Sequence, residues 1–119
     1  MGSFSDLSTR RVRDIRFTRT GYLAGTLADW SLYKEGGALF NHLDTREIAR
    51  IIAPETVAAI FRAACRASDA FGSEKPDTPN PDEGVDYYEI NNLYARRRDV
   101  PELDALFERA LSGGSRMTN

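Results

Sequence analysis

The sequence predicts an α+β fold in which an N-terminal three-stranded antiparallel β-meander packs against three to four C-terminal helices. Two observations lead to this prediction. Apolar residues alternate with polar ones in the first third of the chain, as they do in half-buried strands. After His42 the apolar residues recur at a helical spacing instead. A chain of 119 residues with 41% hydrophobic residues has enough apolar side chains for a packed core, which excludes disorder over most of its length.

The meander is expected over residues 11–43. Ile15 and Phe17 alternate with charged or polar neighbours, and Gly21 follows them as a break. Gly36 and Gly37 separate two apolar runs, and glycine supplies the positive φ that a tight hairpin turn needs. Residues 22–34 can also be read as a helix because several apolar residues fall near helical spacing. Their richness in tyrosine, tryptophan and threonine favours strands.

Helices are expected after the meander. Their ranges run from Asp44 or Thr45 to Pro54, from Glu55 to Gly72, from Val85 to Arg98, and from Asp99 to Gly114. Pro54 either ends the first of these helices or opens the second at its first position. The second has the clearest apolar stripe. The fourth has the strongest start signal, because Pro101 stands in its first turn and Glu102 in the capping-box position.

The chain is expected to form one domain over residues 1–119. Residues 1–10 and 114–119 are expected to be flexible ends, and residues 73–84 an exposed acidic, proline-rich loop. No apolar run approaches the ~20 residues that span a bilayer. The N-terminus lacks an apolar segment of the signal-peptide kind, and a single cysteine cannot form an internal disulfide. We therefore expect a cytoplasmic protein without a membrane partner.

The charges are segregated along the sequence. Residues 1–20 hold five arginines against two aspartates, whereas residues 67–90 hold seven acidic residues against one lysine. Such asymmetry indicates either an electrostatic match within the molecule or a charged face that is offered to a partner.

Few residues suit catalysis or metal binding. His42 is the only histidine, so any histidine base must be this residue, and Asp44 is close enough in sequence to orient its ring. No serine or cysteine can be tied to His42 by sequence. One histidine and one cysteine exclude the usual zinc sites, and the acidic loop lacks EF-hand spacing. No catalytic residue, metal or cofactor is predicted, and an enzyme or small-ligand site around His42 remains the less favoured alternative.

The leading functional prediction is a small non-catalytic protein-interaction module, such as an adaptor, inhibitor or regulator. Adjacent tyrosines on a helix cannot both face the core, so Tyr87 and Tyr88 place an aromatic ring at the surface beside the acidic loop. The candidate protein-binding residues are Tyr87, Tyr88, Asp82, Glu83 and Trp30. The partner is another protein, and a homodimer is a related possibility.

Nucleic-acid binding is the first alternative. The N-terminal arginines could follow a phosphate backbone without reading its sequence. These residues are Arg10, Arg11, Arg13, Arg16 and Arg19. They would fall on both sides of a strand, and the chain has a net charge of −2, so the sequence favours protein binding over this alternative.

Overall fold

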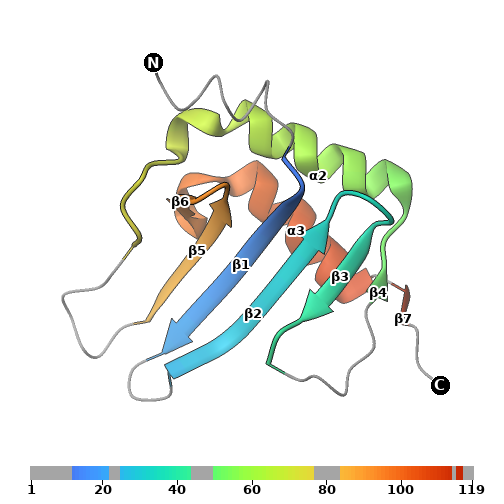
Figure 1. Ribbon diagram of the computed structural model, residues 1–119, viewed down its shortest axis with the longest axis horizontal. Helices are drawn as coiled ribbons and strands as arrows, with labels where there is room; N and C mark the ends of the chain where they lie inside the picture. Colours follow the sequence, from blue (N-terminus) through green and yellow to red (C-terminus); the bar gives the residue numbers. More distant parts are fainter. Residues whose placement is uncertain (1–11, 22–24, 44–49, 77–83, 114, 117–119) are drawn as a thin grey trace.

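The computed structural model describes residues 12–21, 25–43, 50–76, 84–113 and 115–116. These residues form one antiparallel sheet in the order β6-β5-β1-β2-β3-β4-β7, with two α-helices against one face (Figure 1). The strands are β1 (Asp14–Gly21), β2 (Gly25–Tyr33), β3 (Ala38–Asn41), β4 (Arg50–Ile51), β5 (Val85–Ile90), β6 (Leu93–Arg96) and β7 (Ser115–Arg116). The helices are α2 (Pro54–Arg66) and α3 (Pro101–Gly113), with 3₁₀ turns at Ser68–Ala70 and Arg97–Asp99.

The α+β class is therefore right, but the predicted numbers of strands and helices are wrong. The described part of the chain has a seven-stranded sheet and two α-helices, not three strands with three to four helices. The meander itself is present, because β1 pairs with β2 and β2 pairs with β3. Strand β2 settles the choice between helix and strand for residues 25–33.

The hairpin between β2 and β3 turns at the two glycines. Gly36 has φ of 83° and Gly37 has φ of 63°, values that side chains other than glycine rarely adopt. A Cβ on Gly37 would lie 2.7 Å from the carbonyl oxygen of Ile52. The turn therefore fixes the register of the hairpin and holds the start of the helical half close to the meander.

The helix predicted from Val85 to Arg98 is a β-hairpin. Strands β5 and β6 are joined by Asn91 and Asn92, which both have positive φ, 52° and 66°. A type I′ turn requires positive φ at both of its central residues, and asparagine adopts this conformation more readily than most residues. Strand β5 also pairs with β1, so this hairpin extends the sheet on the side away from β3.

The helix predicted to begin at Asp44 or Thr45 is also wrong where it can be checked. Residues 44–49 lie outside the described ranges, but Arg50 and Ile51 form β4 and pair with Leu39 and Ala38. Isoleucine suits a strand because its β-branched side chain packs well on a pleated surface. Ser115–Arg116, in the stretch expected to be a tail, pair with β4 as β7.

Both helices begin with the proline that the sequence predicted near their start, but the predicted capping box is wrong, because Glu102 lies two residues after Val100, which precedes α3, and pairs with Arg66. Helix α2 begins at Pro54, whose fixed φ and missing N–H suit the first turn. It ends at Arg66, earlier than expected, and a 3₁₀ turn leads to Gly72, which bridges to Tyr94 on β6. Helix α3 begins at Pro101 with acidic residues in its first turn. Neither helix is long and apolar enough to span a membrane, nor is any other helix among the described residues.

The core lies between the sheet and the two helices. Ile15, Leu32 and Leu39 from the sheet are fully buried, as are Ile60 of α2 and Leu103 of α3. The molecule measures 42 × 38 × 20 Å, and the shortest dimension corresponds to one sheet and one helical layer. No described helix covers the opposite side of the sheet, which we call the open face.

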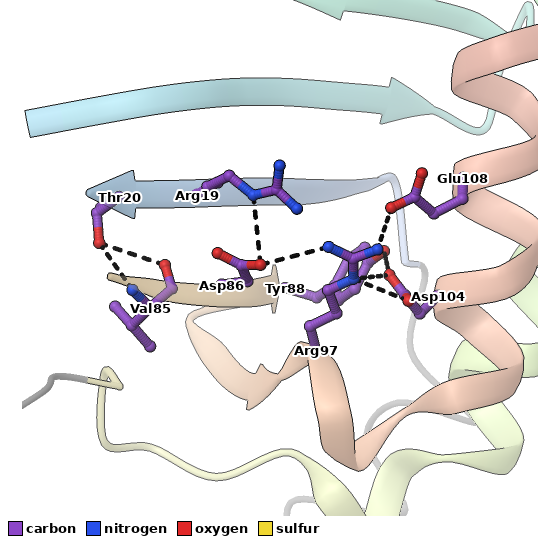
Figure 2. A network of polar contacts seen from close by, with 8 residues as sticks. All are labelled: Arg19, Thr20, Val85, Asp86, Tyr88, Arg97, Asp104 and Glu108. Atoms are coloured by element: carbon purple, nitrogen blue, oxygen red, sulfur yellow. Dashed lines mark hydrogen bonds and ion pairs between the residues drawn. The ribbon is translucent and has the colours of Figure 1, made fainter. Parts of the chain in front are cut away.

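A polar network links the sheet to α3 (Figure 2). Arg97 donates through Nε to Asp104, 2.8 Å away, and also pairs with Glu108 and Asp86. Tyr88 donates its hydroxyl to Asp104 Oδ1 over 2.7 Å. Burial, followed by this hydrogen bond, raises the pKa of Tyr88 above its ordinary value. Since each of these groups has a partner within the chain, the network joins the sheet to α3.

Candidate functional site

The open face carries the side chains that alternate with the core residues. Cross-strand partners share a face, so the register of the sheet identifies them. The face includes Asp14, Arg16 and Thr18 of β1, Asp29, Ser31 and Tyr33 of β2, Ala38 and Phe40 of β3, and Ile51 of β4.

The middle of the open face is polar and internally paired. Arg16 donates through Nε and Nη2 to the two carboxylate oxygens of Asp29, over 2.8 and 2.6 Å. Asp29 is only 8% exposed, and the two-point contact supplies hydrogen bonds to both oxygens of its buried carboxylate. The hydrogen bond with Asp29 raises the pKa of Arg16 further above its ordinary value. Arg16 is therefore committed to a carboxylate of its own chain.

His42 has a partner that the sequence did not predict. Its Nε2 lies 2.7 Å from Oγ of Ser31, and its backbone N–H donates to the carbonyl of Asp29. Ser31 is 2% exposed in the middle of a strand, so a substrate carbonyl has no access to its hydroxyl. Asp44, the expected orienting carboxylate, lies outside the described residues. The contact holds the end of β3 against β2 and does not by itself form a nucleophilic dyad.

One end of the open face is apolar. Tyr33, Phe40 and Ile51 are exposed by 37%, 43% and 42%, and Ala38 lies among them. The rings of Tyr33 and Phe40 meet edge to face, with centroids 5.4 Å apart. We call Tyr33, Ala38, Phe40 and Ile51 the apolar patch.

A groove of about 1000 Å³ adjoins the apolar patch. Tyr33, Ala38 and Phe40 line it, together with Val12. Its other described lining residues are Arg13, Asp14, Lys34 and Glu35, which we call the charged rim. The charged rim holds two positive and two negative side chains, so its net charge is zero.

None of the described residues among those predicted to bind a protein belongs to the apolar patch. Tyr88 faces the helices and is 1% exposed, and Tyr87 is 5% exposed on the open face of β5. They are neighbours on a strand, so the helical argument for exposing one of them does not apply. Trp30 packs partly buried against the core with the guanidinium of Arg50 over its ring. Asp82 and Glu83 lie outside the described ranges. Protein binding by these five residues stays a prediction.

The arginines of the alternative prediction are dispersed. Arg10 and Arg11 lie outside the described residues, and Arg13 is exposed in the charged rim. Arg16 is on the open face, whereas Arg19 is on the helical side and pairs with Asp86 at 3.3 Å. Because β1 lies beside β5, part of the basic segment meets part of the acidic segment within the sheet. Nucleic-acid binding stays a prediction as well.

The apolar patch and the His42 contact were both missed from the sequence, although one signal pointed to them. A four-residue turn at 34–37 would place Tyr33 opposite Ala38, and hence Phe40 opposite Ser31. His42 is then a diagonal neighbour of Ser31. The sequence does not reveal which face of this hairpin the helices cover.

Comparisons with known proteins add no assignment to this surface. No family model matches the sequence, and no curated protein or solved structure is similar to it at a significant level. Within the described residues, no group of three or more histidine, cysteine or acidic side chains is placed to hold a metal ion. The candidate function rests on the geometry of the open face.

Proposed function

We propose that the chain is a protein-interaction module that binds a partner protein through the apolar patch. One observation carries the proposal: Tyr33, Phe40 and Ile51, each more than a third exposed, gather on a sheet face that no described helix covers. Single exposed apolar residues are common, but a group of them on one face is typical of an interaction surface.

The surroundings of the apolar patch support this proposal. Protein interfaces combine an apolar, aromatic centre with a polar rim. Here the edge-to-face pair of Tyr33 and Phe40 borders the charged rim. Two aromatic rings on adjacent strands have little freedom to lose, so a partner would meet a preformed surface.

The two alternatives have less support. A phosphate backbone needs free cationic groups, and Arg16 and Arg19 are already paired with carboxylates. A nucleophilic enzyme needs an accessible hydroxyl, and that of Ser31 is buried.

The proposal is tested by capture of a partner from a lysate of the native host with three tagged forms of the protein. They are the wild type, Phe40→Glu in the apolar patch, and Leu27→Glu as the matched control. Leu27 is 52% exposed on the same sheet, and six residues of strand place it about 20 Å from Tyr33.

We expect the wild type and Leu27→Glu to retain a defined protein. Phe40→Glu should retain at least about tenfold less of the same protein. Circular dichroism checks that both variants remain folded. If the three forms retain the same proteins in the same amounts and the purified chain is a monomer, the apolar patch binds no partner and the proposal is wrong.

A further inference from the structure

We propose that the protein bound at the apolar patch is a second copy of this chain, packed face to face across a two-fold axis. This inference rests on the proposed function, because it assigns an occupant to the same surface. Three properties of the surface favour a second copy: the balance of charge in the charged rim, the shapes present on the patch, and the size and pairing of the open face.

The charged rims of two copies can face each other without net repulsion. Two-fold symmetry places a surface against an identical surface, so a rim of one sign would repel its own copy. Here Arg13 stands beside Asp14 and Lys34 beside Glu35, with zero net charge. The ammonium of Lys34 lies over the ring of Phe61 on α2, so Arg13, which is exposed, is the basic member that can face the acidic members of the other copy. A strongly acidic or basic partner gains no comparable attraction from this rim.

The apolar patch presents both a projecting side chain and a hollow. Ile51 is 42% exposed on β4 and does not line the groove, whereas Tyr33 and Phe40 form part of the groove wall. In a two-fold interface a contact of residue i in one copy with residue j in the other is repeated as a contact of j with i. Ile51 of each copy can therefore contact the groove wall of the other copy.

The open face lies on the 42 × 38 Å side of the molecule, and a standard interface takes roughly 800 Å² from each partner. Its β5 end is already covered, because Val85 and Tyr87 are buried there, so the second copy packs on the part formed by β2, β3 and β4. In the polar centre Arg16 pairs with Asp29 and Ser31 with His42 inside each copy, so these groups keep their partners when the face is covered. The resulting dimer would have two sheets packed about 10 Å apart between two helical layers.

The first test is the mass of the purified protein in solution, measured by sedimentation over roughly three decades of concentration around a micromolar Kd. We expect the wild type to pass from monomer to dimer. Phe40→Glu should raise the dimer Kd by at least about 100-fold, because both copies lose an aromatic anchor. Leu27→Glu should change the dimer Kd by less than about threefold.

The second test uses the charged rim and stays valid if Phe40→Glu does not fold. Arg13→Glu gives the rim a net charge of −2, and Glu35→Lys gives it +2. Each variant alone should dimerise more weakly than the wild type because its rim repels its own copy. An equimolar mixture of the two should form a heterodimer at least about tenfold more tightly than either homodimer.

The outcomes separate this inference from the proposed function. A monomer at every concentration, with a lysate partner lost by Phe40→Glu, overturns the second copy and keeps the interaction module. A dimer that Phe40→Glu leaves intact uses another surface and also overturns the inference. A monomer without any patch-dependent partner overturns both proposals.

Discussion

Replacement of Tyr88 should lower the free energy of unfolding by an amount that follows from the packing and the hydrogen bond of its side chain. Its side chain is 1% exposed and its ring lies 5.0 Å from that of Phe17 and 5.3 Å from that of Phe107, centroid to centroid. Its hydroxyl donates to Asp104, which Arg97 also contacts. Tyr88→Phe removes only the hydroxyl, whereas Tyr88→Ala removes the ring as well.

The hydroxyl of Tyr88 bonds a charged group, and such a hydrogen bond contributes about 1.5–3 kcal/mol. Asp104 keeps Arg97 in the Tyr88→Phe variant, so the loss should fall at the low end, about 1–2 kcal/mol. Tyr88→Ala adds the cavity left by a large aromatic ring, which brings the loss to about 4–5 kcal/mol. That is most of the stability of a marginal domain.

Urea unfolding followed by circular dichroism measures both losses as shifts of the midpoint at constant m-value. Tyr33→Phe is the matched control, because Tyr33 is 37% exposed and its substitution should change the free energy of unfolding by less than about 0.5 kcal/mol. If Tyr88→Phe unfolds at the wild-type midpoint, the buried hydrogen bond does not stabilise the fold. If Tyr88→Ala also loses little, the packing described for the ring is wrong.

Four further predictions follow from single sites. The free energy of unfolding should fall as the pH rises above about 10. Burial raises the pKa of Tyr88 in the folded chain, so at that pH only the unfolded chain loses the phenolic proton. Tyr88→Phe should therefore flatten the decline of the urea midpoint in an alkaline titration. Arg50→Met should lower the free energy of unfolding in urea by about 1–3 kcal/mol, because it removes the hydrogen bond from Nη1 to the carbonyl of Leu111 and the contact with the Trp30 ring. An unchanged midpoint would show that these contacts only offset the cost of burying Nε, which has no hydrogen-bond partner among the described residues. Arg16→Gln should lower the free energy of unfolding by about 1–2 kcal/mol, a value kept small by the 44% exposure of the Arg16 side chain. An unchanged urea midpoint would show that the carboxylate of Asp29 needs no cation beside it. Gly37→Ala should lower the free energy of unfolding by about 3 kcal/mol and Gly36→Ala by about 1 kcal/mol, because only a Cβ on Gly37 meets backbone. Equal losses in urea unfolding would refute the close approach.

The helices that the sequence predicted correctly have local signals. Pro54 and Pro101 each stand at the first position of a helix, and acidic residues follow in the first turn. These signals act within a few residues, so they do not depend on how the rest of the chain folds. The glycines of the β2–β3 turn are local in the same sense, because their positive φ is a property of the turn itself.

The hairpin of β5 and β6 was misread because β5 is covered on both faces. Val85 and Tyr87 are buried on one face of the strand, and Tyr88 and Ile90 are buried on the other. A strand buried on both sides loses the alternation that marks a half-exposed strand, and its apolar residues can then match a helical spacing. The adjacent asparagines at the turn were the local signal that should have decided the assignment.

The apolar patch could not be predicted because it depends on long-range pairing. Tyr33, Phe40 and Ile51 come from three strands, and β4 has only two residues, too few to show a period. Their exposure depends on which face of the sheet α2 and α3 cover, and no local pattern reveals that. The same reasoning explains Arg19 and Asp86, which are distant in sequence and become neighbours only when β1 pairs with β5.

Hydroxyl-radical footprinting of the associated protein tests the central claim most directly, because it reports the solvent exposure of single side chains. We expect oxidation of Tyr33 and Phe40 to fall several-fold in the complex compared with the dilute monomer, whether the partner is a second copy or a captured protein. Oxidation of Leu27, which is 52% exposed at the other end of β2, should stay the same. If Tyr33 and Phe40 are oxidised equally in the free and associated forms, the apolar patch is not the binding surface.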